Sequence, residues 1–374
     1  MARKLQSDKW LFLATLALVC VSVVMVYSAS AVVALDKYQQ PYYFVTRQVM
    51  WALLGLAVLS IVMRIDYRTY QSEQLVWTAL GVVAVLLVAV LFMRPINGSH
   101  RWFGFGGLGI QPSELAKVVA ILFTAVTLDR RMHRISEPKY ALLPVGVIAV
   151  GLAALILVEP DLGTAAALVA VVATMVLAAG LPWRYLVGLG LAAVPAAYIL
   201  IVSAPYRLRR WTAFWNPEAD PLGDGFHIIQ STIAVGSGGM LGRGLMGGMQ
   251  KLFFLPEPHT DFIFAVIAEE LGFVGATLVV ACFTIIAWRG LKAAIAAPDR
   301  FGAFLALGIT TMVVAQAFVN LSVVLGLMPT KGIPLPLVSS GGSSLLVNLA
   351  SIGILLNISQ HGVEERAAVE PGVS

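Results

Sequence analysis

The chain has very little charge for its length. Only 12% of its 374 residues are charged, whereas about 25% is usual for a soluble domain. Hydrophobic residues make up 59% of the sequence, and the mean hydropathy is +0.86. These proportions exclude a soluble globular protein of this size, and we expect no nucleic-acid partner.

Cysteine is also scarce. The chain has two, Cys20 and Cys282, and both lie inside apolar runs. This excludes a disulfide framework and a cysteine-built metal site, so we expect both to pack as small hydrophobic side chains.

What the sequence has in abundance is apolar runs of about 20 residues, the length that crosses a hydrocarbon core. We predict an all-α, polytopic membrane protein, a single domain over 1–374 with about ten transmembrane helices. One long extracytoplasmic loop, about 205–261, should separate helices 7 and 8, and about 361–374 should form a short disordered tail. The expected helices cover 10–33, 44–63, 75–93, 111–128, 140–158, 162–180, 184–204, 262–288, 302–327 and 338–359.

Lysine and arginine in the short loops predict the orientation, because cytoplasmic loops carry more of them. Alternate loops differ clearly in this respect, and the basic set includes the N-terminal end. Ten helices would return the C-terminal end to the same side. We therefore place both termini in the cytoplasm. The basic set comprises Arg3, Lys4, Lys9, Arg64, Arg68, Arg130, Arg131, Arg134, Lys139, Arg184, Arg289, Lys292 and Arg300.

Several polar residues fall at the outer ends of the predicted helices. Arg101 and Trp102 precede a helix that Pro112 can open. In that helix Glu114 and Lys117 are three residues apart and share a face, so they can pair. This pair is either structural or part of a site.

A tight turn at Glu159-Pro160-Asp161 follows the fifth predicted helix. Asp161 precedes the next apolar run, and we expect it to cap that helix.

The long loop carries clustered arginines and glycines, including Arg210 and Arg243. Arginine can hold a pyrophosphate by paired hydrogen bonds, and glycine lets the backbone approach it. Arginines beside a membrane span also bind lipid head groups, so both interpretations stay open.

Asp261 stands where the loop enters the eighth helix, two residues after His259. Partial burial there should raise the pKa of its carboxyl group. A carboxylate of that kind can serve as a general base near neutral pH, and a helix cap is the alternative. Deeper in the same helix, Glu269 and Glu270 need partners: either basic side chains of neighbouring helices, which we favour, or a proton pathway.

A proline-rich stretch at 328–336, then serines and glycines at 339–344, precede the last helix. Irregular backbone at membrane depth is tolerated only where it is buried in protein or lines a cavity. We therefore expect Lys331, Ser339 and Ser343 to lie in a site wall.

Three of these motifs resemble the SEDS family (shape, elongation, division and sporulation). They are the 256–264 segment with 269–272, Asn216-Pro217 with Asp220-Pro221, and 334–336 with 339–344. Lys331 and 250–252 resemble the division branch, FtsW, whereas 228–231 with 234–239 look somewhat like the elongation branch, RodA; we favour FtsW. The likeness runs from the first predicted helix to the last.

The resemblance implies a peptidoglycan glycosyltransferase that polymerises lipid II. It also implies a class B penicillin-binding protein as partner, alongside divisome or elongasome proteins and membrane lipids. Asp261 matches the family's catalytic aspartate, and Trp102, Glu114 and Lys117 match positions around the same cavity. A divalent cation, Mg or Mn, is a possible cofactor. The residues that we expect to bind substrate are Arg101, Trp102, Glu114, Lys117, Arg210, Arg243, His259, Lys331, Ser339 and Ser343.

Two other functions compete with this one. A lipid II flippase should have its polar site near the bilayer midplane, often in inverted repeats; only Glu269 and Glu270 fit that better. A scaffold that anchors a division protein would not need Asp261.

Overall fold

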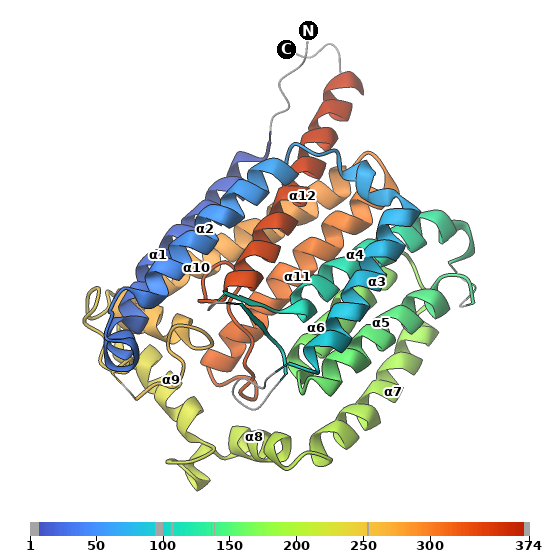
Figure 1. Cartoon of the computed structure of the whole chain (residues 1–374). Helices are drawn as coiled ribbons and strands as arrows, with labels where there is room; N and C mark the ends of the chain where they lie inside the picture. Colours follow the sequence, from blue (N-terminus) through green and yellow to red (C-terminus); the bar gives the residue numbers. More distant parts are fainter. Residues whose placement is uncertain are drawn as a thin grey trace.

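A computed structural model describes residues 7–93, 100–105, 108–135, 137, 139–252 and 254–369. The chain folds into helices that run between two opposite ends of one bundle (Figure 1). The helices are α1 (Lys9–Tyr38), α2 (Tyr43–Val62), α3 (Glu73–Val90), α4 (Pro112–Arg131), α5 (Leu142–Val158), α6 (Leu162–Ala178), α7 (Trp183–Val202), α8 (Pro205–Trp215), α9 (Phe226–Ser237), α10 (Ile263–Ala296), α11 (Arg300–Val324) and α12 (Gly342–Val369). Short 3₁₀ turns are η1 (Tyr67–Gln71), η2 (Met132–Arg134) and η3 (Pro217–Ala219).

The all-α membrane fold is confirmed. By length and composition, seven helices within the described part of the chain can cross a membrane: α1, α2, α3, α7, α10, α11 and α12. Helices α5 and α6 are apolar but shorter, and α4 has 20 residues. These ten helices overlap the ten predicted ranges, and the number that cross the membrane stays a prediction.

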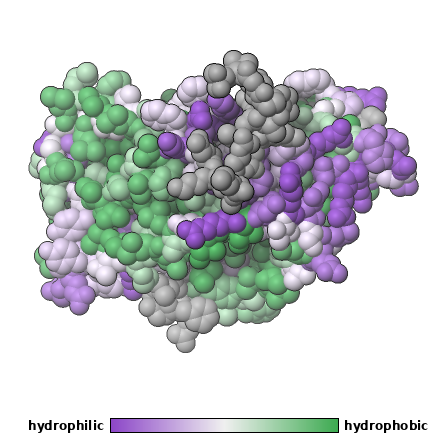
Figure 2. Space-filling view, turned by 90° about the horizontal axis from the view of Figure 1, so that it is seen from above, coloured by the Kyte–Doolittle hydropathy of each residue, from purple (hydrophilic) through white to green (hydrophobic). Residues whose placement is uncertain are grey.

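The core lies along α4, α11 and α12, which Figure 1 shows in the middle of the bundle. Of the 20 residues of α4, 15 are buried, and many are small, such as Ser113, Ala116 and Ala120. Small side chains let membrane helices approach closely. By contrast, α7 lies at the edge and has no buried residue in its apolar window. Seen from the end that carries the termini, hydrophilic residues gather on the right of the face and hydrophobic ones on the left (Figure 2).

Helix α10 contains a kink at Gly272, whose φ of 68° and ψ of −164° are not helical. The loop before it packs here: the Phe273 amide donates to the Gly239 carbonyl oxygen over 2.9 Å. A Cβ atom on Gly272 would lie 2.2 Å from the Gly242 nitrogen. Position 272 therefore requires glycine, because the positive φ disfavours a side chain and the Gly242 backbone leaves no room for one.

Two expectations need correction. The predicted disordered tail begins as helix, since α12 continues to Val369; Glu, Arg and Ala after residue 363 are good helix formers. The cysteines are both free, as expected, but Cys20 is exposed on α1 rather than packed inside.

The segment about 205–261 contains α8, η3 and α9. It lies at the opposite end of the bundle from the termini (Figure 1). A short antiparallel pair, β1 (Phe103–Phe105) with β2 (Leu108–Ile110), leads into α4 with Phe103 opposite Ile110. That the chain is one domain, with its long loop outside the cell, stays a prediction.

Candidate functional site

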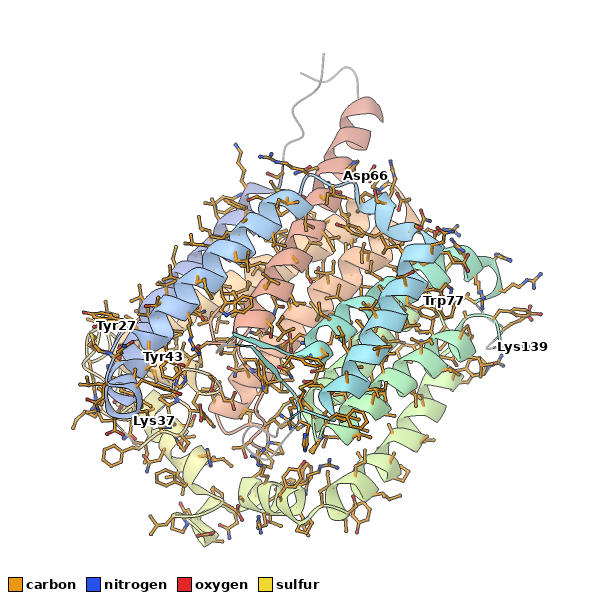
Figure 3. The ribbon with its side chains drawn as sticks, viewed as in Figure 1. Tyr27, Lys37, Tyr43, Asp66, Trp77 and Lys139 are labelled. Atoms are coloured by element: carbon orange, nitrogen blue, oxygen red, sulfur yellow. The ribbon has the colours of Figure 1, made fainter. Side chains whose placement is uncertain are left out.

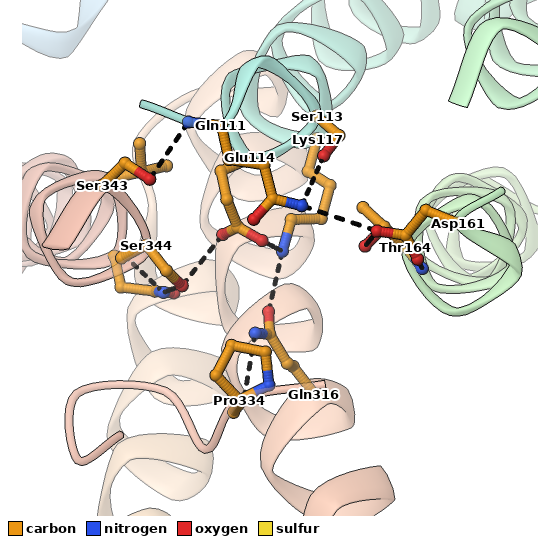
Figure 4. A network of polar contacts seen from close by, with 12 residues as sticks. Gln111, Ser113, Glu114, Lys117, Asp161, Thr164, Gln316, Pro334, Ser343 and Ser344 are labelled. Carbon is orange, nitrogen blue, oxygen red and sulfur yellow. Dashed lines mark hydrogen bonds and ion pairs between the residues drawn. The ribbon is translucent and has the colours of Figure 1, made fainter. Parts of the chain in front are cut away.

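A buried ion pair lies at the start of α4 (Figure 4). Lys117 Nζ is 2.9 Å from Glu114 Oε1, and both side chains are almost fully buried. The same ammonium donates to Gln316 Oε1 of α11 over 2.8 Å. Ser344 Oγ of α12 donates to Glu114 Oε2 over 3.1 Å. The predicted pair is confirmed, and it joins three helices.

The entrance to α4 is tied to α12 and α6. The Gln111 amide nitrogen donates to Ser343 Oγ over 3.2 Å, and Gln111 Nε2 donates to Asp161 Oδ2 over 3.5 Å. Asp161 caps α6 as predicted, because its Oδ1 accepts the Thr164 amide hydrogen over 3.0 Å. Ser343 therefore belongs to the hydrogen-bond network that joins the start of α4 to α12 and α6.

Arg101 wraps the turn between α5 and α6. Its Nε donates to the Glu159 carbonyl oxygen over 3.1 Å, and its Nη2 donates to that of Pro160 over 2.5 Å. Its Nη1 lies 3.8 Å from Asp161 Oδ2. Pro160 adopts a φ of 34°, and the guanidinium group holds this unusual turn. Trp102 packs beside it on Gly109, where a Cβ atom would lie 2.9 Å from the indole ring.

Glu159, in the same turn, has no exposed surface. Neither carboxyl oxygen has a hydrogen-bond partner among the described residues. Burial, then the Asp161 charge, raises the pKa of Glu159 to about 8, against the opposing effect of Arg101. The group is therefore mainly protonated at neutral pH.

Asp261 does not cap α10. The helix begins at Ile263, its N-cap residue is Phe262, and no side chain caps it. Asp261 is half-buried, and its carboxyl group does not cap the helix. Burial, then the Glu257 charge, raises the pKa of Asp261 to about 7, while Arg210 and Arg101 act to lower it.

Asn320 of α11 fixes the backbone around Asp261. Its Nδ2 donates to the Asp261 carbonyl oxygen over 2.9 Å and to the Ile333 carbonyl oxygen over 2.8 Å. Gly332 then comes so close that a Cβ atom there would lie 3.0 Å from Asp261 Oδ2. The proline-rich stretch thus forms the wall beside this carboxylate, as the sequence predicted.

The other predicted residues of this wall have different surroundings. Lys331 is half-buried; burial lowers the pKa of its ammonium group and the Asp161 charge raises it. Ser339 Oγ donates to the Thr260 carbonyl oxygen over 2.6 Å and accepts from the Leu335 amide over 2.7 Å. Ser339 therefore shapes the loop. The His259 ring packs on the Phe44 ring, with the two ring centres 4.4 Å apart. Burial lowers the pKa of the His259 imidazole.

The two predicted loop arginines are not together. Arg210 is exposed on α8, with its guanidinium carbon 5.9 Å from the centre of the Tyr206 ring, and its charge acts on Asp261. Arg243 instead lies 3.6 Å from Glu269 Oε1. This ion pair does not support a substrate-binding role for Arg243, and that role stays a prediction.

Glu269 and Glu270 are fully buried and have partners, as favoured from the sequence. Lys251 Nζ lies 2.6 Å from Glu270 Oε1, and the Met249 amide donates to Glu269 Oε1 over 2.8 Å. The basic partners come from the loop before α10, however, rather than from neighbouring helices. These carboxylates hold that loop to α10 because each charge needs compensation in a buried place.

Sequence reasoning missed two residues of this region, Gln316 and Asn320, and assigned no role to Glu159. Gln316 and Asn320 are amides four residues apart in an apolar helix, a spacing that places them on one face. That pattern was a usable signal. The burial of Glu159 was not predictable, because Arg101, which binds its turn, comes from 58 residues earlier in the chain.

A metal centre built by the protein has no support in the described part of the chain, where no three His, Cys, Asp or Glu side chains come together. Mg²⁺ is often held by one or two carboxylates and by substrate phosphates. Asp261 fits that looser arrangement, and a cation requirement stays a prediction.

Comparison with known proteins gives a consistent result. The profile of a family of cell cycle proteins, FtsW, RodA and SpoVE, matches residues 9–364. The chain is 45% identical over 356 residues to the probable peptidoglycan glycosyltransferase FtsW of Geobacter metallireducens, covering 94% of each protein. It is 41% identical to stage V sporulation protein E of Bacillus subtilis, covering 96% of this chain and 98% of that one.

Solved structures agree with this. One match, described as "Structural coordination of polymerization and crosslinking by a peptidoglycan synthase complex", has a TM-score of 0.79 and 34% identity over 96% of this chain and 99% of the other. The rod shape determining protein RodA of Thermus thermophilus matches with a TM-score of 0.70 and 30% identity, covering 95% and 97% of the two chains. The higher identity to FtsW than to RodA agrees with the branch predicted from the motifs.

Proposed function

The chain belongs to the FtsW, RodA and SpoVE family of integral membrane proteins and is a peptidoglycan glycosyltransferase, and we propose that it polymerises lipid II with Asp261 as the general base. Three observations on Asp261 carry this proposal. Asp261 is a half-buried carboxylate with a pKa of about 7, it caps no helix, and its backbone is fixed by Asn320. A base of that pKa is well matched to work near neutral pH.

The proposed step is a single displacement. The 4-hydroxyl oxygen of one lipid II attacks the anomeric carbon of another, and the bond from that carbon to the pyrophosphate oxygen breaks. The hydroxyl proton passes to the Asp261 carboxylate, and undecaprenyl pyrophosphate leaves with the bonding electrons. The configuration at the anomeric carbon is inverted.

Positive charge near Asp261 supports the departure of the pyrophosphate. Arg101 and Arg210 both act electrostatically on this carboxylate. Lys331 precedes Gly332, where an added Cβ atom would lie 3.0 Å from Asp261 Oδ2. Preorganised cations stabilise the charge that develops in the transition state. Asp261 could also hold a divalent cation together with the substrate phosphates, and that ion would supply further positive charge.

The Glu114–Lys117 pair supports the site rather than the chemistry. Its charges are compensated by each other, by Gln316 and by Ser344. Gln316 Nε2 also donates to the Pro334 carbonyl oxygen over 3.2 Å. The pair therefore positions the stretch that contains Lys331 and Gly332.

The partner and location follow as proposals. A related chain comes from a peptidoglycan synthase complex, which supports a class B penicillin-binding protein as partner, with divisome or elongasome proteins around it. The basic loops favour a bacterial cytoplasmic membrane with both termini inside. The 205–261 segment, which ends at Asp261, then lies on the outer side, because α8 and α9 lie at the opposite end of the bundle from the termini (Figure 1).

The flippase is not favoured. Glu269 and Glu270 were the features that suited transport better, and both are compensated by Lys251, Arg243 and backbone amides. A proton pathway needs groups that can change charge. Glu269 and Glu270 instead bind the loop before α10 through ion pairs and hydrogen bonds.

The test is polymerisation of labelled lipid II by the purified protein with its cognate transpeptidase, comparing wild type with Asp261→Ala. Moenomycin is included, because it blocks unrelated glycosyltransferases that can contaminate the preparation. We expect moenomycin-resistant glycan chains from wild type alone. Equal chains from both proteins would remove Asp261 from the mechanism. No chains from a folded wild-type complex that still binds lipid II would reject the polymerase, and transport would then be measured.

A further inference from the structure

A groove of about 360 Å³ lies between α3, α4 and α5, away from Asp261. A pocket of this size is within the range that holds small ligands. Its wall is mainly apolar, and the Trp77 and Phe123 rings meet edge to face at 5.5 Å. On the α5 side, Leu143 and Val147 are about 60% exposed. The groove therefore opens sideways, toward the surroundings of the bundle.

The mouth of the groove is basic. Arg130, Arg131 and Lys139 line it together with one carboxylate, Glu73. Arg130 Nη1 pairs with Glu73 Oε2 over 2.6 Å. Arg131 Nη1 donates to the Tyr140 carbonyl oxygen over 2.8 Å, and neither Arg131 nor Lys139 has a carboxylate partner among the described residues. Two positive charges thus remain uncompensated at this mouth.

The groove lies at one face of the bundle, far from the proposed catalytic site. Helix α4 has 20 residues and so spans about 30 Å; Glu114 lies near its start, and Arg130 and Arg131 lie at its end. Figure 3 shows Trp77 and Lys139 on the same flank, which is also the side where hydrophilic residues gather in Figure 2. Tryptophan and basic residues at a membrane interface commonly contact lipid head groups.

We propose that this groove is a binding site for an anionic phospholipid. The phosphate would sit between Arg131 and Lys139, and an acyl chain would lie along Trp77 and Val147. The apolar wall and the basic mouth together match a molecule that has an apolar chain directly joined to a negative head group. The proposal is independent of Asp261 and of the reaction it serves.

Charge and shape are tested by separate variants of the full chain in detergent. Arg131→Gln with Lys139→Gln removes the uncompensated charges, and Arg64→Gln with Lys292→Gln is the matched control, since both are exposed basic residues outside the groove. Val147→Phe fills the groove without changing charge. Val150→Phe is its control, because Val150 is exposed to nearly the same extent, 62% against 60%, and lies outside the lining.

Native mass spectrometry with added phosphatidylglycerol or phosphatidylcholine measures the affinity. We expect wild type to bind phosphatidylglycerol more tightly. Loss of two interfacial charges should weaken that binding by roughly 10- to 30-fold, and Val147→Phe should weaken it as well. Both controls should bind like wild type.

The proposal fails if the two lipids bind wild type equally. It also fails if the control pairs lose as much affinity as the groove variants. Should Val147→Phe abolish binding of lipid II instead, the groove belongs to the lipid-linked substrate and the phospholipid assignment is wrong.

Discussion

Glu159 should make the stability of this protein fall as the pH rises. Its carboxyl group is fully buried and unpartnered among the described residues. Its pKa is about 8 in the folded protein, against 4.5 for an ordinary glutamate. The folded state therefore holds a proton that the unfolded state has already lost between these two values. Stability is highest below about pH 4.5 for this group and declines until the pH passes about 8.

The size of the effect follows from the shift. One pKa unit corresponds to about 1.4 kcal/mol, so the shift of Glu159 from 4.5 to about 8 lowers the free energy of unfolding by at most about 5 kcal/mol at pH 9. Glu159→Gln has nearly the same shape and cannot ionise. It should melt at a higher temperature than wild type at pH 9 and at a similar temperature near pH 4.5.

The assay is thermal unfolding in detergent from pH 4.5 to 9. Glu218→Gln is the matched control, because Glu218 is an exposed glutamate of the 205–261 segment. It should follow wild type at every pH. If Glu159→Gln shows the same pH dependence as wild type, the carboxyl group is solvated or paired, and the reasoning is wrong.

Three further substitutions test the architecture around the carboxylate. Glu114→Gln leaves a buried ammonium group without its charge partner and should cost about 3–5 kcal/mol in thermal unfolding. Glu73→Gln, in an exposed ion pair, should cost far less, because solvent screens its charge; equal losses would show that burial does not decide the value. Asn320→Ala releases two backbone carbonyl groups and should slow polymerisation by on the order of 10²-fold through misplacement of the base; an unchanged rate would count against this positioning role. Gly332→Ala should slow the reaction without lowering the melting temperature, since its Cβ would lie 3.0 Å from the catalytic carboxylate. Gly341→Ala, with an ordinary contact at 3.7 Å, should leave the rate unchanged, and a loss there would show that the effect is not local.

The sequence was sufficient where a contact is local. Glu114 and Lys117 are three residues apart, so their pairing followed from helix geometry. Asp161 precedes an apolar helix, so its capping role followed from the preference of aspartate for that position. The partial burial of Asp261 followed from its place between a polar loop and an apolar helix.

The sequence was insufficient where partners are distant. Lys251 could not be matched to Glu270, because that contact depends on how the loop folds back at the Gly272 kink. The same holds for Arg243, which we expected near a pyrophosphate and which lies against Glu269. Asn320 joins Asp261 to Ile333 across three segments, and such a contact is set by packing rather than by pattern.

The central claim is that Asp261 is the general base, and its pH dependence tests that claim most directly. The rate of lipid II polymerisation should be measured from pH 5.5 to 8.5 for wild type and for Asp261→Asn, with the melting temperature followed in parallel. The base acts only when deprotonated, so the wild-type rate should rise with pH and level off above about 7. Asp261→Asn should stay folded and polymerise at a rate lower by about 10²-fold or more. A normal rate for Asp261→Asn, or a wild-type rate that does not change across this range, would contradict the account.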